Sequence, residues 1–246
     1  MGLRFKVKSQ LDHEEKGGIL DDCGPSSMAA AVSWAFKYAP GKDFTAGDGI
    51  AAKQKATGHV DKQGVADNGS SLGDLIKTAN VMGAKARWAV SWEDAVEAAK
   101  KGAALGVWVQ QPVGYPAGVE ISEWHVRWSK WWGKKDPKHL AEGYGHMTAA
   151  AYDPEIGWQW ACPTRTGKGK EQYGVPVTEA QLKQIADSKR VSKVHVAPPF
   201  KHVIIVEAPK GWVAPVAPTP VVVAPAPVVP VKPVPCPACG GTGVKK

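Results

Sequence analysis

The apolar residues before residue 208 follow helical spacing in some segments and strand spacing in others. An apolar run at 28–36 follows Ser26 and Ser27 and predicts a helix, because no glycine or proline interrupts it. Further helices are predicted at 70–79 and 93–101, and strands at 85–90 and 105–109. This mixture predicts an α+β domain.

A β-hairpin is predicted in the second half of the chain. The strand-like run that follows Gly145 stops at 153–157, where Asp, Pro and Gly provide turn chemistry. Residues 158–162 then have the pattern of the returning strand. We expect Tyr152 to face Trp158 across this hairpin, and this pairing sets the register of its two strands.

Beyond Ala208 the pattern changes to a run of Val, Ala and Pro that holds half of the chain's 20 prolines. Regularly spaced prolines prevent a membrane helix and favour the extended polyproline II conformation, so this run predicts a semi-rigid arm. We therefore expect a folded domain at 1–207, a Pro-rich linker at 208–235 and a short tail at 236–246.

The net charge of +8 comes from 31 basic and 23 acidic residues, and the excess gathers at 124–140 and 208–246. No helix-turn-helix, zinc-finger or RNA-binding motif accompanies it, so we expect no specific nucleic-acid partner. The N-terminal residues lack the apolar core of a secretory signal, and no transmembrane segment is predicted.

Cys23 is the first candidate for chemistry, because it stands at the start of the segment that is predicted to be helical, with Ser26 and Ser27 in the first turn. The unpaired amides and the dipole of a helix N-terminus favour an anion, which lowers the pKa of a thiol placed there. The alternative for an isolated cysteine is simple packing. His146 follows Gly145 at the open end of a predicted strand and is the candidate base for Cys23.

These segments resemble the papain-like cysteine peptidases of the double-glycine-leader type, which have relatives among phage lysins. Asp22-Cys23-Gly24-Pro25-Ser26-Ser27 and Gly145-His146 leading to Tyr152-Asp153 carry the resemblance, which spans roughly residues 15 to 207. The resemblance implies a papain-like fold, in which the N-terminal helix packs on an antiparallel sheet. It also implies Cys23 as nucleophile and His146 as general base in amide hydrolysis through an acyl-enzyme.

Two positions depart from the family pattern. The family's oxyanion glutamine is absent from 17–20, and the nearest glutamine is Gln10. The family's Asp-Pro or Asn-Pro is replaced by Cys162-Pro163, while Thr164 stands opposite His146 in the predicted register. Cys162 or Thr164 is therefore expected behind the imidazole, and an inactive relative is the alternative to an enzyme.

Two clusters lie outside this pattern. Four tryptophans at helical spacing have three explanations, namely core packing, substrate stacking beside the cleft, or insertion at a membrane interface. Substrate contact is the functional explanation we favour for Trp124, Trp128, Trp131 and Trp132. Cys236 and Cys239 form one Cys-x-x-Cys pair, which predicts half of a zinc site or, alternatively, an unmetallated or disulfide-linked turn.

The sequence thus predicts a cysteine peptidase that needs no cofactor for catalysis. Peptidoglycan stem peptides are the expected substrate, and a phage lysin or virion-associated enzyme is the expected setting. The Pro-rich arm would dock on virion proteins, and the protein would reside in the virion or in the host cytoplasm until lysis. The alternative is a non-catalytic structural or binding protein of a phage particle that reuses the fold.

Overall fold

A computed structural model describes residues 2–9, 22–58, 70–111, 144–164, 172–187 and 202–213. The chain divides into two compact units, Met1–Ala214 and Pro215–Lys246. All described residues belong to the first unit, which contains the predicted domain at 1–207 and a few residues of the predicted linker.

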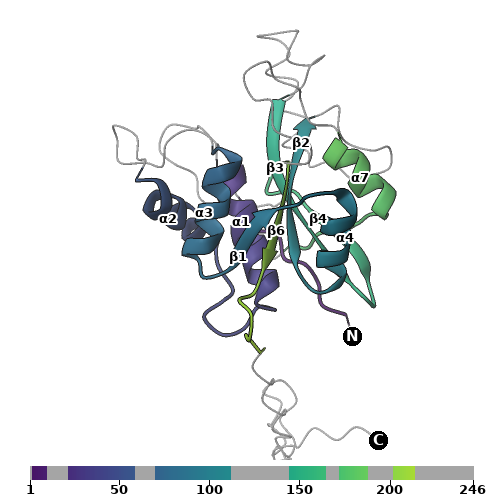
Figure 1. The fold of residues 1–246 in the computed structure, drawn as a ribbon, viewed down its shortest axis with the longest axis horizontal. Coiled ribbons are helices and arrows are strands. Elements are labelled where there is room, and N and C mark those ends of the chain that lie inside the picture. The colour runs from purple at the N-terminus through teal and green to yellow at the C-terminus, as the bar shows by residue number, and fades with distance from the viewer. Residues whose placement is uncertain are drawn as a thin grey trace, which may run out of the picture. The chain divides into compact units, whose positions relative to one another are not determined.

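The described residues form an α+β domain (Figure 1). Its helices are α1 (Cys23–Ala35), α2 (Ala46–Thr57), α3 (Leu72–Val81), α4 (Trp92–Lys100) and α7 (Glu179–Asp187). Its strands are β1 (Lys85–Trp88), β2 (Ala104–Gln111), β3 (Tyr144–Asp153), β4 (Gly157–Ala161), β5 (Val175–Pro176) and β6 (Val203–Glu207). The helices and strands predicted between 28 and 109 are confirmed to within a few residues.

The six strands pair antiparallel in the order β1-β6-β2-β3-β4-β5. The predicted hairpin is present as β3 and β4, and Tyr152 pairs with Trp158 as expected. Gly157 adopts a φ of 89° at the start of β4, a conformation that glycine tolerates best. The predicted antiparallel sheet is therefore confirmed, and so is the register of its hairpin.

Helix α1 is the central helix of the domain, because every residue from Gly24 to Ala35 is buried. It packs on β3 and β2 and is covered by α2 and α3, which explains its apolar composition on all sides. A Cβ at Gly49 of α2 would lie 2.3 Å from the Pro25 carbonyl oxygen, so a glycine is required where α2 crosses α1. The predicted packing of the N-terminal helix on the sheet is confirmed.

The sheet separates two hydrophobic cores. The α1-face core contains Met28 and Trp34 of α1 and Phe36 directly after it, together with Met147 and Ala149 of β3. The α4-face core contains Leu105 and Val107 of β2, Ala150 of β3, Trp160 of β4 and Leu182 of α7. Successive residues of β3 therefore point alternately into one core and the other, as the pleat of a strand requires.

Both ends of the described chain are fixed to the domain. Near the N-terminus, the Phe5 backbone N–H donates to Gln159 Oε1 at 2.9 Å, and the Phe5 ring packs edge-on against Trp34. At the other end, the Trp212 ring packs edge-on against Phe36, with ring centroids 5.2 Å apart. Residues beyond Ala208, which we assigned to the linker, thus contribute to the α1-face core.

Candidate functional site

Cys23 occupies the first position of α1 and is half-buried against the α1-face core. The helix begins here because the Asp22 carbonyl accepts a 3.0 Å hydrogen bond from the Ser26 N–H, which closes the first turn. The Cys23 side chain therefore lies at the end of α1 where backbone N–H groups lack helical partners and the dipole is positive.

His146 is the third residue of β3 and is buried, with 4 % of its surface exposed. It pairs with Val109 of β2. The glycine before it has a steric reason, since a Cβ at Gly145 would lie 2.0 Å from Cζ2 of the Trp108 indole. Trp108 is half-buried on the α1-face core, so its ring crosses β3 directly beside the histidine.

One hydrogen bond joins the two elements that carry Cys23 and His146. The Ser27 hydroxyl of α1 donates to the Met147 carbonyl of β3 at 2.9 Å. Cys23 precedes Ser27 by one helical turn, about 6 Å along the axis, and His146 precedes Met147 by one residue. Figure 1 shows the beginnings of α1 and β3 at the same end of the sheet.

The imidazole lies on the side of the sheet opposite to α1. Met147 points into the α1-face core, and His146 contacts Cys162, a member of the α4-face core. A reaction that uses Cys23 and His146 together must therefore take place across the end of the sheet, where β3 begins.

A series of buried side chains holds the imidazole in place. His146 Nε2 lies 3.3 Å from Cys162 Sγ, and Cys162 Sγ lies 3.0 Å from Thr164 Oγ1. Cys162 is 4 % exposed and Thr164 is 2 % exposed. The predicted diagonal neighbour, Cys162, is therefore the side chain that contacts the histidine, and Thr164 supports the thiol from behind.

A second buried network stiffens the same region. Trp160 Nε1 donates to Thr148 Oγ1 at 2.9 Å, and the Thr148 hydroxyl donates to the Val107 carbonyl at 2.9 Å. The sequence analysis did not identify Thr148 or Trp160. Their positions could have indicated them, because Thr148 lies two residues after His146 and Trp160 two residues before Cys162, which places all four side chains on one face of the hairpin.

Several predicted residues lie outside the described part of the chain. They are the four tryptophans Trp124, Trp128, Trp131 and Trp132, the cysteine pair Cys236 and Cys239, and the segment 10–20 that was examined for an oxyanion glutamine. Their roles stay predictions.

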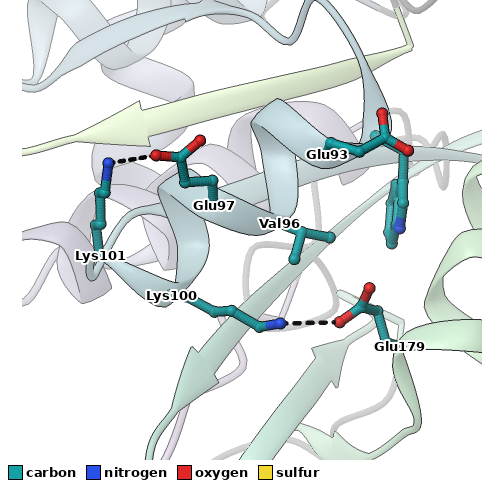
Figure 2. A pocket seen from close by; sticks show the side chains of 7 residues that line it. Glu93, Val96, Glu97, Lys100, Lys101 and Glu179 are labelled. Atoms are coloured by element: carbon teal, nitrogen blue, oxygen red, sulfur yellow. Dashed lines mark hydrogen bonds and ion pairs between the residues drawn. The ribbon is translucent and has the colours of Figure 1, made fainter.

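A surface hollow of about 400 Å³ lies elsewhere, between α4 and the start of α7 (Figure 2). Four of its charged side chains form two ion pairs, since Lys100 pairs with Glu179 and Lys101 with Glu97. The remaining lining residues are Trp92, Glu93 and Val96. Because no cysteine or histidine lines it, this hollow adds nothing to the site at His146.

Among the described residues, no group of three or more His, Cys, Asp or Glu side chains is arranged to hold a metal ion. None of the helices in the described ranges is long and apolar enough to cross a membrane. Comparisons of the chain with protein-family models and with curated protein sequences found no match. The resemblance to double-glycine-leader peptidases therefore rests on the residues quoted above.

Proposed function

We propose that this protein is a cysteine peptidase with a papain-like fold, in which Cys23 is the nucleophile and His146 the general base. The observation that carries the proposal is the contact of His146 Nε2 with Cys162, because it orients a buried imidazole at the end of the sheet where α1 begins. A nucleophile, a base and a third group behind the base are the parts that thiol hydrolases need.

The proposed reaction proceeds through an acyl-enzyme. His146 accepts the proton of the Cys23 thiol at Nδ1, and the thiolate attacks the carbonyl carbon of the amide. The imidazolium then protonates the leaving amine as the carbon–nitrogen bond breaks, which leaves a thioester. Water attacks the thioester, His146 accepts its proton, and the products are a carboxylate and the regenerated thiol.

The oxyanion of the tetrahedral intermediate requires hydrogen-bond donors. The backbone N–H of Cys23 is the donor that we propose, because the first amides of a helix have no carbonyl partner within the helix. This donor belongs to the same residue as the nucleophile, so its position is set by α1 itself.

Peptidoglycan stem peptides are the substrate that we propose, in a phage lysin or a virion-associated enzyme. The Pro-rich arm would hold the domain on a neighbouring virion protein, and release from the host cytoplasm would follow lysis. The spacing of the prolines supports this role, because it favours an extended polyproline II segment, which spans distance without folding.

The second candidate is a non-catalytic structural or binding protein of a phage particle. A specific observation favours it: the group behind His146 is a cysteine side chain, whereas triads of this kind use a carboxylate or an amide. In this case the site is a structural remnant, and Cys23 has the reactivity of an ordinary half-buried thiol.

Alkylation of the full chain by iodoacetamide at neutral pH separates the two candidates. Peptide mapping follows Cys23 and Cys162 in the same sample, and the urea-unfolded chain provides the intrinsic rate of each thiol. The peptidase predicts that Cys23 reacts faster in the native protein than in urea, and that His146→Ala removes the difference. A native rate at or below the unfolded rate refutes an activated nucleophile.

A further inference from the structure

Three polar side chains lie in series on the α4 side of the sheet: His146, Cys162 and Thr164. The two contacts, Nε2 to Sγ at 3.3 Å and Sγ to Oγ1 at 3.0 Å, connect an imidazole to a hydroxyl through one thiol. Each member is at most 4 % exposed, so bulk water does not compete for these positions.

The thiol of Cys162 has a single proton, and its direction decides which tautomer the neutral imidazole adopts. If S–H donates to His146 Nε2, the ring proton must be on Nδ1. If S–H donates to Thr164 Oγ1, sulfur accepts from Nε2–H, and Nδ1 carries the lone pair. Only the second arrangement lets Nδ1 act as a base.

We propose that Thr164 is a positioning residue that fixes the tautomer of His146 through Cys162. The hydroxyl oxygen accepts the thiol proton, the sulfur then accepts from Nε2–H, and Nδ1 is left as the basic nitrogen. Both distances allow this arrangement, because sulfur lies 3.3 Å from Nε2 and 3.0 Å from Thr164 Oγ1. A catalytic role for this tautomer rests on the proposed function, whereas the assignment of the tautomer itself does not.

This arrangement differs from a carboxylate in how it acts. A carboxylate both orients the ring and stabilises the imidazolium by charge. The series from Thr164 to His146 is neutral when Cys162 is a thiol, so it selects a tautomer without adding a negative charge. Loss of the threonine hydroxyl is therefore expected to change the tautomer while the fold remains intact.

The test is long-range proton–nitrogen NMR of the full chain labelled with ¹⁵N-histidine, at a pH where the imidazole is neutral. The spectrum shows which ring nitrogen carries the proton, and His146→Gln identifies the signals of His146 among the seven histidines. We expect Nε2–H in the natural chain, Nδ1–H in Thr164→Val, and Nε2–H again in Thr164→Ser. Thr164→Ala replaces the valine variant if its melting temperature shows that valine does not fit.

Two outcomes overturn the proposal that Thr164 fixes the His146 tautomer through Cys162. One is an Nδ1–H tautomer in the natural chain, and the other is a tautomer that is the same in the natural chain and in Thr164→Val. If the protein hydrolyses peptides, Thr164→Val should also lower kcat about 10- to 100-fold with little change in KM, and Thr164→Ser should restore it. If the protein cleaves no peptide but shows the expected tautomers, the peptidase proposal is refuted and the role of Thr164 in setting the tautomer is supported. If the protein cleaves peptides and its tautomer is the same with and without the Thr164 hydroxyl, the peptidase proposal is supported and the role of Thr164 is refuted.

Discussion

The two ends of the layer formed by α1 and β3 are built for different purposes. At one end, α1 begins with the half-buried thiol of Cys23, and β3 carries His146 as its third residue. At the other end, Phe36 of the α1 C-terminus packs against Trp212, and Asp153 accepts backbone hydrogen bonds at the end of β3. The first end places the proposed nucleophile and base where backbone donors remain, and the second end is filled with aromatic rings and hydrogen-bonded polar atoms.

The same helix and strand thus carry the proposed catalytic residues at one end and contacts that stabilise the domain at the other. The aromatic contact of Phe36 with Trp212 lies at the end remote from the thiol, about 20 Å away along a thirteen-residue helix. Changes at the first end should therefore affect chemistry without unfolding the domain, and changes at the second end should do the opposite.

The largest expected effect is at the reactive end. Cys23→Ala should lower the rate of cell-wall fragment hydrolysis by about 10⁴-fold or more, because no other group replaces the nucleophile. Its melting temperature should stay close to that of the natural chain. Cleavage assays and thermal unfolding of the same preparations check both statements, and an active alanine variant would exclude Cys23 as the nucleophile.

Phe36→Ala tests the opposite end. The Phe36 ring is 2 % exposed and contacts Trp212, so its removal should lower the free energy of unfolding by about 3–5 kcal/mol. The alkylation rate of Cys23 in the folded variant should be unchanged. A variant that unfolds normally but loses Cys23 reactivity would show that the two ends are coupled.

Asp153 gives the stable end a pH dependence. Burial acts to raise its pKa, but backbone N–H groups of Leu3, Glu155 and Ile156 and the charge of Lys37 outweigh this effect and hold the pKa below its ordinary value. The fold therefore favours the ionised carboxylate. This stabilisation is present above the pKa of the unfolded chain and is lost as the pH falls through the lower folded value.

Asp153→Asn should consequently cost about 1–3 kcal/mol at pH 7 and progressively less in acid. Urea unfolding of both chains between pH 2 and 7 measures the difference, where the range brackets the ordinary carboxyl pKa of about 4. A difference that does not change with pH would mean that the carboxylate charge contributes nothing.

Truncation within the predicted linker gives a smaller effect. A chain that ends at Ala208 lacks Trp212, whereas one that ends at Val213 keeps its contact with Phe36. The shorter chain should be less stable by about 1–2 kcal/mol, because it loses one partly buried aromatic pair. Thermal unfolding of the two chains measures this difference in stability. Equal melting temperatures would show that Trp212 does not stabilise the domain.

Cys162→Asp gives the smallest expected effect and tests whether a negative charge beside His146 limits turnover. A carboxylate beside Nε2 would stabilise the imidazolium by charge, and we expect turnover to rise about 10-fold if charge is what the natural site lacks. The matched control is Cys162→Asn, which offers an oxygen without the charge. Equal rates in both variants would show that orientation, and not charge, limits the reaction.

The sequence predicted the elements well where local chemistry dictates them. The turn residues from Asp153 to Gly157 fix the pairing of Tyr152 with Trp158, and the Gly-free, Pro-free run after Pro25 yields α1. Such signals need no knowledge of distant residues, which explains their success.

The partner of His146 was harder to predict, because β4 ends at Ala161 before its pairing reaches residue 146. Pro163 has no N–H to continue a ladder, so the strict register that would place Thr164 opposite the histidine does not apply there. Likewise, the proline-rich composition after Ala208 gave no sign that Trp212 returns to the domain. Contacts of this kind depend on tertiary packing and not on local pattern.

The position of β6 has a mechanical consequence. This strand lies inside the sheet, paired with β1 on one side and β2 on the other, and it leads directly to the turn at Pro209 and to Trp212. Tension applied to the chain beyond residue 213 would first pull on the Trp212 contact. It would then load two hydrogen-bonded ladders along their length at the same time, whereas an edge strand could peel away one bond after another. Tension on the residues beyond 213 would therefore be resisted by the centre of the sheet, at the end of the domain remote from Cys23 and His146.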